Sequence, residues 1–217
     1  MTKIYLYKRF ERFWHWSQAA LIIFLAITGF EVHGSFSLFG FEKAVVFHRV
    51  ASYAFLILIG LAIFWHFTTG EWKQYLPTTR NIKKQVNYYT MGIFKGEAHP
   101  AMNKKVRKLN PLQVLVYLGF KLLIVPVMVV SGLMYMFYKY IDINDVVVIS
   151  GFELRTIAVI HTFGAFLLVA FLIVHVYMTT TGEHVTTNIK AMLTGYEEVE
   201  HEEGKVQSEE EVTVSEI

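Results

Sequence analysis

The stretch from Ile157 to Tyr177, IAVIHTFGAFLLVAFLIVHVY, most constrains what this chain can fold into. As a helix rising about 1.5 Å per residue, this apolar run is long enough to cross most of a bilayer core of ~30 Å. It contains two histidines, His161 and His175, fourteen residues apart. Helical geometry puts them about 40° apart around the axis and about 21 Å apart along it. The two imidazoles are therefore predicted to lie on one helix face at two depths.

Two interpretations of these histidines compete. Hydrogen bonds to a neighbouring helix are the simpler explanation for a lone intramembrane histidine. Ionisable residues inside a membrane helix are nevertheless rare and usually functional, and here two share a face. A helix that gives an axial imidazole to each of two stacked haems needs this arrangement, so we favour haem ligation. The chain has no cysteine, which excludes thiolate-held clusters and covalent CxxCH haem attachment.

The composition indicates an integral membrane protein. Hydrophobic residues make up 54% of the chain and aromatic residues 16%, which is more apolar than a soluble domain requires. The first apolar segment lacks a small-residue cleavage site, so it is predicted to be a retained helix and not a signal peptide. We predict an all-α fold, a four-helix transmembrane bundle. Its spans are residues 13–30, 46–67, 112–137 and 156–178.

The distribution of basic residues predicts the orientation. The chain before Trp14 holds four Lys or Arg residues against one acid, and the loop 69–111 holds nine against two. The other two connections are acidic or balanced. By the positive-inside rule, both termini and the long basic loop are predicted to be cytoplasmic. The loop itself is expected to be solvated or to contact anionic lipids.

The composition changes abruptly after Gly195. Residues 196–217 hold nine glutamates and one lysine, so this segment is predicted to be a disordered acidic tail. Residues 1–195 are predicted to form the membrane domain. Three histidines outside the predicted spans are assigned no ligand role: His99, His184 and His201.

Three further histidines lie in the first two spans. His15 is near the cytoplasmic end of the first span, between two tryptophans. His48 and His66 are near opposite ends of the second, eighteen residues or five turns apart on one face. Matching depth pairs His48 with His161 in the outer leaflet. In the inner leaflet His175 has two possible partners, His15 and His66, so five histidines compete for four coordination positions.

Some other residues in the spans have two interpretations. Gly29, in a TG pair, would admit a flat macrocycle, although close helix packing explains a membrane glycine equally well. Gly132, in an SG pair, is another point of close approach. Pro126 predicts a kink in the third helix. Lys121 either snorkels to the interface or neutralises a haem propionate.

Several short motifs together resemble the bacterial cytochrome b561 family. Its members include the b-type subunits of nickel-iron hydrogenases, respiratory formate dehydrogenases and thiosulfate reductases. The motifs are RFERFWHW in the first span, FHR at the head of the second, KLNPLQ before the third, TG and SG in the first and third, and H-x13-H in the fourth. The resemblance covers roughly residues 5 to 195. KLNPLQ leans toward the thiosulfate-reductase-like branch.

The resemblance implies two b-type haems, with His15 and His175 holding the inner one and His48 and His161 the outer one. It also implies a subunit of a respiratory complex in the bacterial inner (cytoplasmic) membrane. Such a subunit transfers electrons between a periplasmic catalytic or electron-transfer subunit and menaquinone or ubiquinone. His66 departs from the family pattern and is expected to contact quinone or a haem edge. The other expected partner is the lipid bilayer, and no nucleic-acid partner is expected.

The alternative is a haem-free membrane transporter or anchor in which the histidines form a proton relay. A relay needs neither a flat cavity nor matched depths across helices, whereas haem needs both. Bis-imidazole ligation leaves no open iron position. Electron transfer, and not chemistry on oxygen or a small molecule, is therefore the expected role.

Overall fold

The computed structural model describes residues 2–76, 82–92, 95, 108–109, 111–138, 153–180 and 185–199. Its elements are, in chain order, β1 (Thr2–Tyr5), α1 (Arg9–Val32), α2 (Phe41–Thr69), the 3-10 helix η1 (Glu71–Tyr75), α3 (Ile82–Asn87), the π-helix η2 (Tyr88–Gly92), α4 (Pro111–Gly119), the π-helix η4 (Phe120–Ile124), α5 (Val125–Phe137), α6 (Leu154–Thr179), α7 (Thr187–Thr194) and β2 (Tyr196–Val199).

The prediction of four membrane-spanning helices is confirmed. Among the described residues, four helices are long and apolar enough to cross a membrane: α1, α2, the continuous helix Leu112–Phe137 and α6. Three of them begin before the predicted bounds: α1 at Arg9, α2 at Phe41 and α6 at Leu154. Their first turns carry charged residues, so hydropathy alone places the start too late. Gly40, whose φ of +86° suits glycine, marks the start of α2.

The third span contains a π-helical segment where the sequence predicts a kink. Pro126 has no backbone N–H, and its ring crowds the carbonyl of the preceding turn. The chain accommodates it with the five-residue π-helix η4, directly before α5. Such π segments often occur at functional sites. This one contains Lys121, the charged residue of the span.

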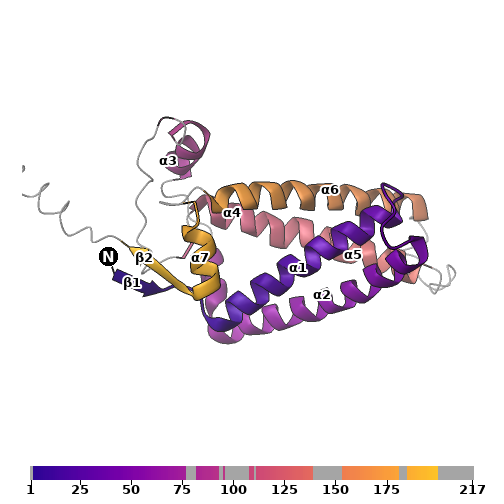
Figure 1. The fold of residues 1–217 in the computed structure, drawn as a ribbon, viewed down its shortest axis with the longest axis horizontal. Coiled ribbons are helices and arrows are strands. Elements are labelled where there is room, and N and C mark those ends of the chain that lie inside the picture. The colour runs from indigo at the N-terminus through magenta and orange to yellow at the C-terminus, as the bar shows by residue number, and fades with distance from the viewer. Residues whose placement is uncertain are drawn as a thin grey trace, which may run out of the picture.

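The four spans form two helical hairpins that lie side by side (Figure 1). In one hairpin α1 packs on α2, and in the other α5 packs on α6. The strands β1 and β2 and the short helix α7 lie together at one end of the bundle. We call this end, where α1 begins and α6 finishes, the inner end. The opposite end, where α1 meets α2, is the outer end.

The segment predicted to be an acidic disordered tail begins with an ordered strand. Tyr196–Val199 forms β2, which pairs antiparallel with β1 in a register that sets Thr2 opposite Val199 and Tyr5 opposite Tyr196. The rings of Tyr5 and Tyr196 lie 5.0 Å apart. Backbone pairing with a strand nearly two hundred residues away is long-range, so composition did not indicate it. Residues 200–217 lie outside the described part of the chain.

The helix α7 is fastened to the first turns of α1. The Arg12 guanidinium donates a hydrogen bond to the Leu193 carbonyl, and the Trp16 indole donates one to the Met192 carbonyl at 3.2 Å. Gly195 follows with a φ of +90°, and a Cβ there would meet the Tyr7 carbonyl at 2.8 Å. These contacts connect α7, which follows α6 in the chain, to the start of α1.

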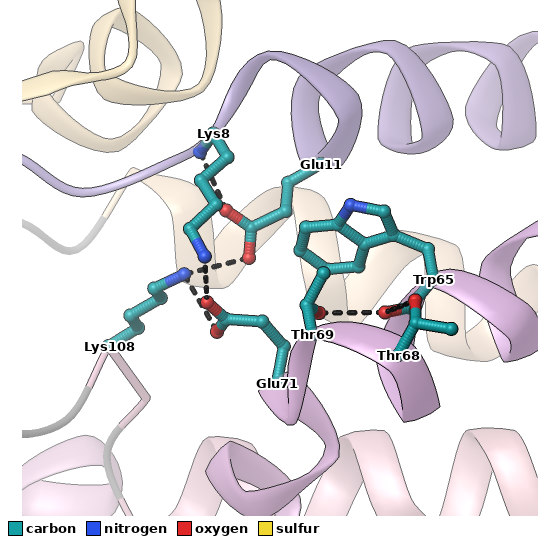
Figure 2. A network of polar contacts seen from close by, with 7 residues as sticks. All are labelled: Lys8, Glu11, Trp65, Thr68, Thr69, Glu71 and Lys108. Carbon is teal, nitrogen blue, oxygen red and sulfur yellow. Dashed lines mark hydrogen bonds and ion pairs between the residues drawn. The ribbon is translucent and has the colours of Figure 1, made fainter.

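A cluster of four charged residues closes the inner end (Figure 2). The Lys108 ammonium lies 2.8 Å from the Glu11 carboxylate and 3.0 Å from that of Glu71, and the Lys8 ammonium lies 2.8 Å from Glu71. The Lys8 backbone N–H also donates to Glu11 at 2.6 Å. The cluster therefore joins the start of α1, the helix η1 that follows α2, and the chain segment before α4.

The pH dependence of stability should reflect this cluster. Burial raises the pKa of Glu71, but hydrogen bonds and charge from Lys8 and Lys108 outweigh it, and the net pKa is lowered. Because this pKa lies below the unfolded value of about 4.3, the stabilisation is complete above that value and is lost as pH falls through the folded-state pKa. At pH 7 we expect Glu71→Gln to destabilise the protein by about 2 kcal/mol, because Lys8 loses its ion pair with Glu71 and largely buried Lys108 keeps only that with Glu11 among the described residues.

Thermal unfolding in detergent, measured from pH 7 down to pH 3, tests this. The difference between the variant and the unmodified chain should shrink at the acidic end. Glu42→Gln, at an exposed position in the first turn of α2, is the control and should melt like the unmodified chain. Equal melting of all three at pH 7 would contradict a stabilising role for the cluster.

Candidate functional site

Four histidines come together as two pairs of facing imidazoles. The ring centroids of His15 and His175 lie 6.0 Å apart toward the inner end, and those of His48 and His161 lie 6.3 Å apart toward the outer end. A first-row metal ion bonded at about 2.0 Å to each of two opposed imidazoles would put their centroids about 6 Å apart. Both pairs therefore have a spacing that fits axial ligation of a haem iron.

The two pairs connect the hairpins. The helix α6 contributes one member of each pair, His161 and His175, while α1 contributes His15 and α2 contributes His48. The fourteen-residue spacing on α6 thus appears in the fold as two levels of paired side chains. Every pair bridges the α1–α2 hairpin and the α5–α6 hairpin.

Each outer imidazole lies against a buried hydroxyl. The Nδ1 atom of His48 is 3.0 Å from the Thr28 hydroxyl, and that of His161 is 2.9 Å from the Ser131 hydroxyl. Thr28 is 0% exposed and Ser131 4%. Each hydroxyl also donates to the carbonyl four residues before it, Thr28 to Phe24 at 2.8 Å and Ser131 to its own preceding turn at 2.5 Å.

These contacts favour a proton on Nδ1 of each outer imidazole. A serine or threonine hydroxyl has one hydrogen, and here it is directed at a backbone carbonyl, which can only accept. In that arrangement the hydroxyl oxygen accepts a hydrogen bond from the imidazole Nδ1–H, and the backbone of Leu25 and of Met128 also hydrogen-bonds to His48 and His161, respectively. Nε2 is consequently unprotonated in His48 and His161, which is the state a metal ligand requires.

The residue after each hydroxyl is a glycine that makes room for the imidazole. A Cβ added at Gly29 would meet His48 Cε1 at 3.1 Å, and one added at Gly132 would meet His161 Cε1 at 3.2 Å. Both distances are tighter than ordinary carbon contacts. At these two positions the small residue accommodates the ring of the neighbouring histidine.

The inner pair has different surroundings. The Nδ1 atom of His15 is buried and has no hydrogen-bond partner among the described residues. That of His175 lies 3.4 Å from the Tyr117 hydroxyl, a long contact. The ring of Phe171 stacks on His175 at 5.7 Å, and Phe120 stacks in turn on Phe171 at 4.3 Å. The inner imidazoles are thus held mainly by apolar and aromatic packing.

His66 lies apart from both pairs. Its Nδ1 lies 2.7 Å from the Ala62 carbonyl in its own helix. Its ring is buried and packs against those of Trp14 at 5.2 Å, Trp65 at 5.3 Å and Tyr75 at 5.5 Å. Within the described part of the chain, the His66 ring thus packs against three aromatic side chains. Although helix spacing puts His66 and His175 at a similar depth, no contact between their rings occurs among the described residues.

Lys121 extends from η4 into the same aromatic cluster. Its ammonium lies 3.3 Å from the ring centroid of Tyr75 and 5.1 Å from that of Trp14. These are cation–π distances. Within the described residues the ammonium therefore lies against aromatic rings. We call the four residues Trp14, His66, Tyr75 and Lys121 the inner aromatic cluster.

Some of these residues are not in the predicted site. The glycines of the TG and SG pairs are singled out in the sequence, but the hydroxyls of Thr28 and Ser131 are not. The repetition of a hydroxyl–glycine dipeptide in the first and third spans was the available signal. Tyr75 carried no signal, because it lies in the basic loop. Of the histidines outside the spans, His33 is exposed at the end of α1, and three lie outside the described residues: His99, His184 and His201.

Comparison with known proteins bears on the whole chain. The model of the family described as prokaryotic cytochrome b561 matches residues 6–195. The chain is 30% identical over 203 residues to a protein of Escherichia coli (strain K12) named "Putative cytochrome YdhU", an alignment that covers 89% of this chain and 74% of that protein. No solved structure gives a significant match. The family match spans all four membrane helices and the five candidate haem-ligand histidines, His15, His48, His66, His161 and His175.

Proposed function

Because the chain belongs to the prokaryotic cytochrome b561 family, we propose that it is the di-haem membrane subunit of a respiratory oxidoreductase. In this proposal His15 and His175 hold an inner b haem, and His48 and His161 hold an outer one. The subunit transfers single electrons across the inner membrane between a periplasmic redox partner and the quinone pool. A thiosulfate reductase, a hydrogenase or a formate dehydrogenase is the class of complex expected.

The observation that carries this proposal is the pair of facing imidazoles at each end of the bundle. Both centroid separations, 6.0 and 6.3 Å, suit two axial bonds to one iron. The two levels are separated by fourteen residues of one helix, about 21 Å along its axis. With both axial positions taken, iron offers no site to an external ligand. A haem there supplies reversible one-electron storage.

A reduced-minus-oxidised visible spectrum of the purified chain tests the proposal. We expect split b-type bands and two haems per chain by quantitative haem extraction. A histidine proton relay in a haem-free transporter or anchor would give a featureless spectrum, even from cells supplied with haem. That result would rule out the electron-transfer function.

Quinone is proposed to react at the inner end, next to the inner haem. The inner aromatic cluster supports this location, because it combines flat rings with two polar groups, His66 and the Lys121 ammonium. A quinone ring stacks on aromatic faces, and its carbonyl oxygens accept hydrogen bonds. Menaquinone and ubiquinone share both properties.

The periplasmic partner is proposed to meet the outer end near the α1–α2 connection. Three large apolar side chains are exposed there: Phe36 at 45%, Leu38 at 64% and Phe41 at 64%. The Glu31 carboxylate holds this connection in shape, because it accepts backbone N–H bonds from Leu38, Phe39 and Gly40 at 2.7 to 2.8 Å. The partner is also proposed to meet the second outer connection, residues 139–155, of which residues 139–152 lie outside the described residues.

Cysteine labelling tests the predicted topology, with both termini cytoplasmic. The chain has no native cysteine, so Ser37→Cys introduces a single thiol in the exposed α1–α2 connection. An impermeant maleimide should label it in intact spheroplasts. Thr90→Cys, at an exposed position of the long basic loop, is the matched control and should react only after lysis. The reverse pattern would invert the orientation.

The contact of Gly29 with His48 predicts a specific loss of haem. Gly29→Val adds bulk where even a Cβ lies 3.1 Å from the imidazole, and overpacking of this kind costs about 1–3 kcal/mol. We expect the outer haem to be bound roughly five- to a hundredfold more weakly, measured as haem content after detergent purification. Gly60→Val is the control, because nothing lies within 4 Å of a Cβ at that position. Equal haem content in the two variants would contradict the predicted role of Gly29.

A further inference from the structure

The two outer histidines share a supporting device that the inner histidines lack. We call the dipeptides Thr28–Gly29 in α1 and Ser131–Gly132 in α5 the hydroxyl–glycine pairs. In each, the glycine leaves space for an outer imidazole, and the hydroxyl lies 2.9 to 3.0 Å from its Nδ1. One pair faces His48 and the other faces His161. The device therefore occurs once in each hairpin, on both sides of the proposed outer haem.

At the inner level the Nδ1 atoms are poorly supplied with acceptors. That of His15 has no partner in the described part of the chain, and that of His175 lies at the long distance of 3.4 Å from the Tyr117 hydroxyl. Along the chain Arg12 lies in the turn before His15 and Lys121 one turn after Tyr117, and the carboxylates of Glu11 and Glu71 also lie at the inner end. At the outer level the buried carboxylate of Glu31 lies in the turn after Thr28.

We propose, on the basis of the di-haem function above, that Thr28 and Ser131 are positioning residues that keep the outer haem at a lower midpoint potential than the inner one. An acceptor on Nδ1–H makes the imidazole a stronger donor to iron through Nε2, and this stabilises the ferric state. Imidazoles without such acceptors favour the ferrous state. The hydroxyls thus make the midpoint potential at the outer level lower than that at the inner level.

This difference in midpoint potential gives electron transfer between the two haems a favoured direction. One electron passing from the outer to the inner level goes from the lower to the higher midpoint potential, so the ferrous outer iron is oxidised and the ferric inner iron is reduced. Transfer is then spontaneous, in the absence of a membrane potential, from the periplasmic partner toward quinone. The opposite direction requires an input of energy.

The test is a potentiometric measurement of both haems in the full-length protein, followed by visible and electron paramagnetic resonance spectra. We expect two midpoint potentials with the outer haem lower. The removed hydrogen bond in Thr28→Val or Ser131→Ala is worth about 1 kcal/mol, which corresponds to a roughly fivefold change in the ferric-to-ferrous equilibrium. At 59 mV per tenfold change for one electron, the outer potential should rise by about 40 mV. The inner potential should not change.

Matched variants separate the hydrogen bond from general structural effects. Thr28→Ser and Ser131→Thr retain the hydroxyl and should restore the unmodified outer potential. Thr68 has the same hydroxyl-to-carbonyl bonding, to Phe64 at 2.9 Å, but is exposed and has no histidine beside it. Thr68→Val should therefore leave both potentials unchanged. Tyr117→Phe should leave the outer potential unchanged.

The possible failures are distinguishable. A chain that binds fewer than two haems contradicts the proposed function itself. Two haems with an outer potential that neither Thr28→Val nor Ser131→Ala shifts would overturn the inference and leave the function intact, as would an outer potential above the inner one. Loss of the outer haem in both variants, with normal helix content, would mean that the hydroxyls retain haem and do not tune it, which also contradicts the inference.

Discussion

The His161→Ala variant is expected to bind one b haem per chain, against the two proposed for the unmodified protein. The same haem should be missing from His48→Ala, because the two imidazoles face each other at 6.3 Å in the outer half of the bundle. Removing either leaves an iron with one axial protein ligand. The remaining haem should keep its spectrum and midpoint potential, since His15 and His175 lie at the other level. Haem extraction and low-temperature spectra of the two variants measure this.

His33→Ala is the control for these substitutions. His33 is an exposed histidine at the end of α1, outside both pairs, and its loss should leave two haems. The double variant His48→Ala/His161→Ala should resemble either single variant in haem content, because both members serve one iron. Removal of different haems by the two single substitutions would show that the helices pair in another way.

The second large effect distinguishes His15 from His66. We expect His15→Ala to lose the inner haem and His66→Ala to retain it. His15 faces His175 at 6.0 Å, whereas the Nδ1 of His66 lies against the Ala62 carbonyl and its ring is enclosed by aromatic side chains. An octahedral haem iron has two axial positions, so His15 and His66 cannot both join His175. Haem content and the spectrum of the inner haem decide between them.

The His66→Ala variant also bears on quinone. If His66 contacts a quinone oxygen, losing a hydrogen bond of about 1 kcal/mol weakens quinol binding roughly fivefold and leaves the iron ligands in place. Reduction by quinol should then be slower, while dithionite still reduces both haems completely. Tyr196→Phe, far along the chain in β2, is the control and should leave both readouts unchanged. Loss of the inner haem in His66→Ala with retention in His15→Ala would overturn the assignment.

Much of the architecture follows from local sequence properties. A membrane span needs only length and apolar composition, so all four spans were predictable, and the third agrees with the predicted residues 112–137. The common face of His161 and His175 follows from the helical repeat alone. The polar ends of helices were less predictable, because charged first turns such as that of α2 lower hydropathy without ending the helix. The acidic composition of residues 196–217 predicts disorder, and the ordered strand β2 is not locally predictable because its pairing partner β1 is at the other end of the chain.

The sequence by itself determined the four membrane helices, the two histidine levels and the family, because each depends on residues close together in the chain or on a motif pattern. Only the tertiary structure decided that the imidazole of His15, and not that of His66, faces His175. Depth along a helix is set by residue spacing, but the direction of a side chain between helices depends on how each helix is rotated against its neighbours. The same packing turns Thr28 and Ser131 toward His48 and His161. Which hydroxyl meets which imidazole is a property of contacts between hairpins, and no local periodicity contains it.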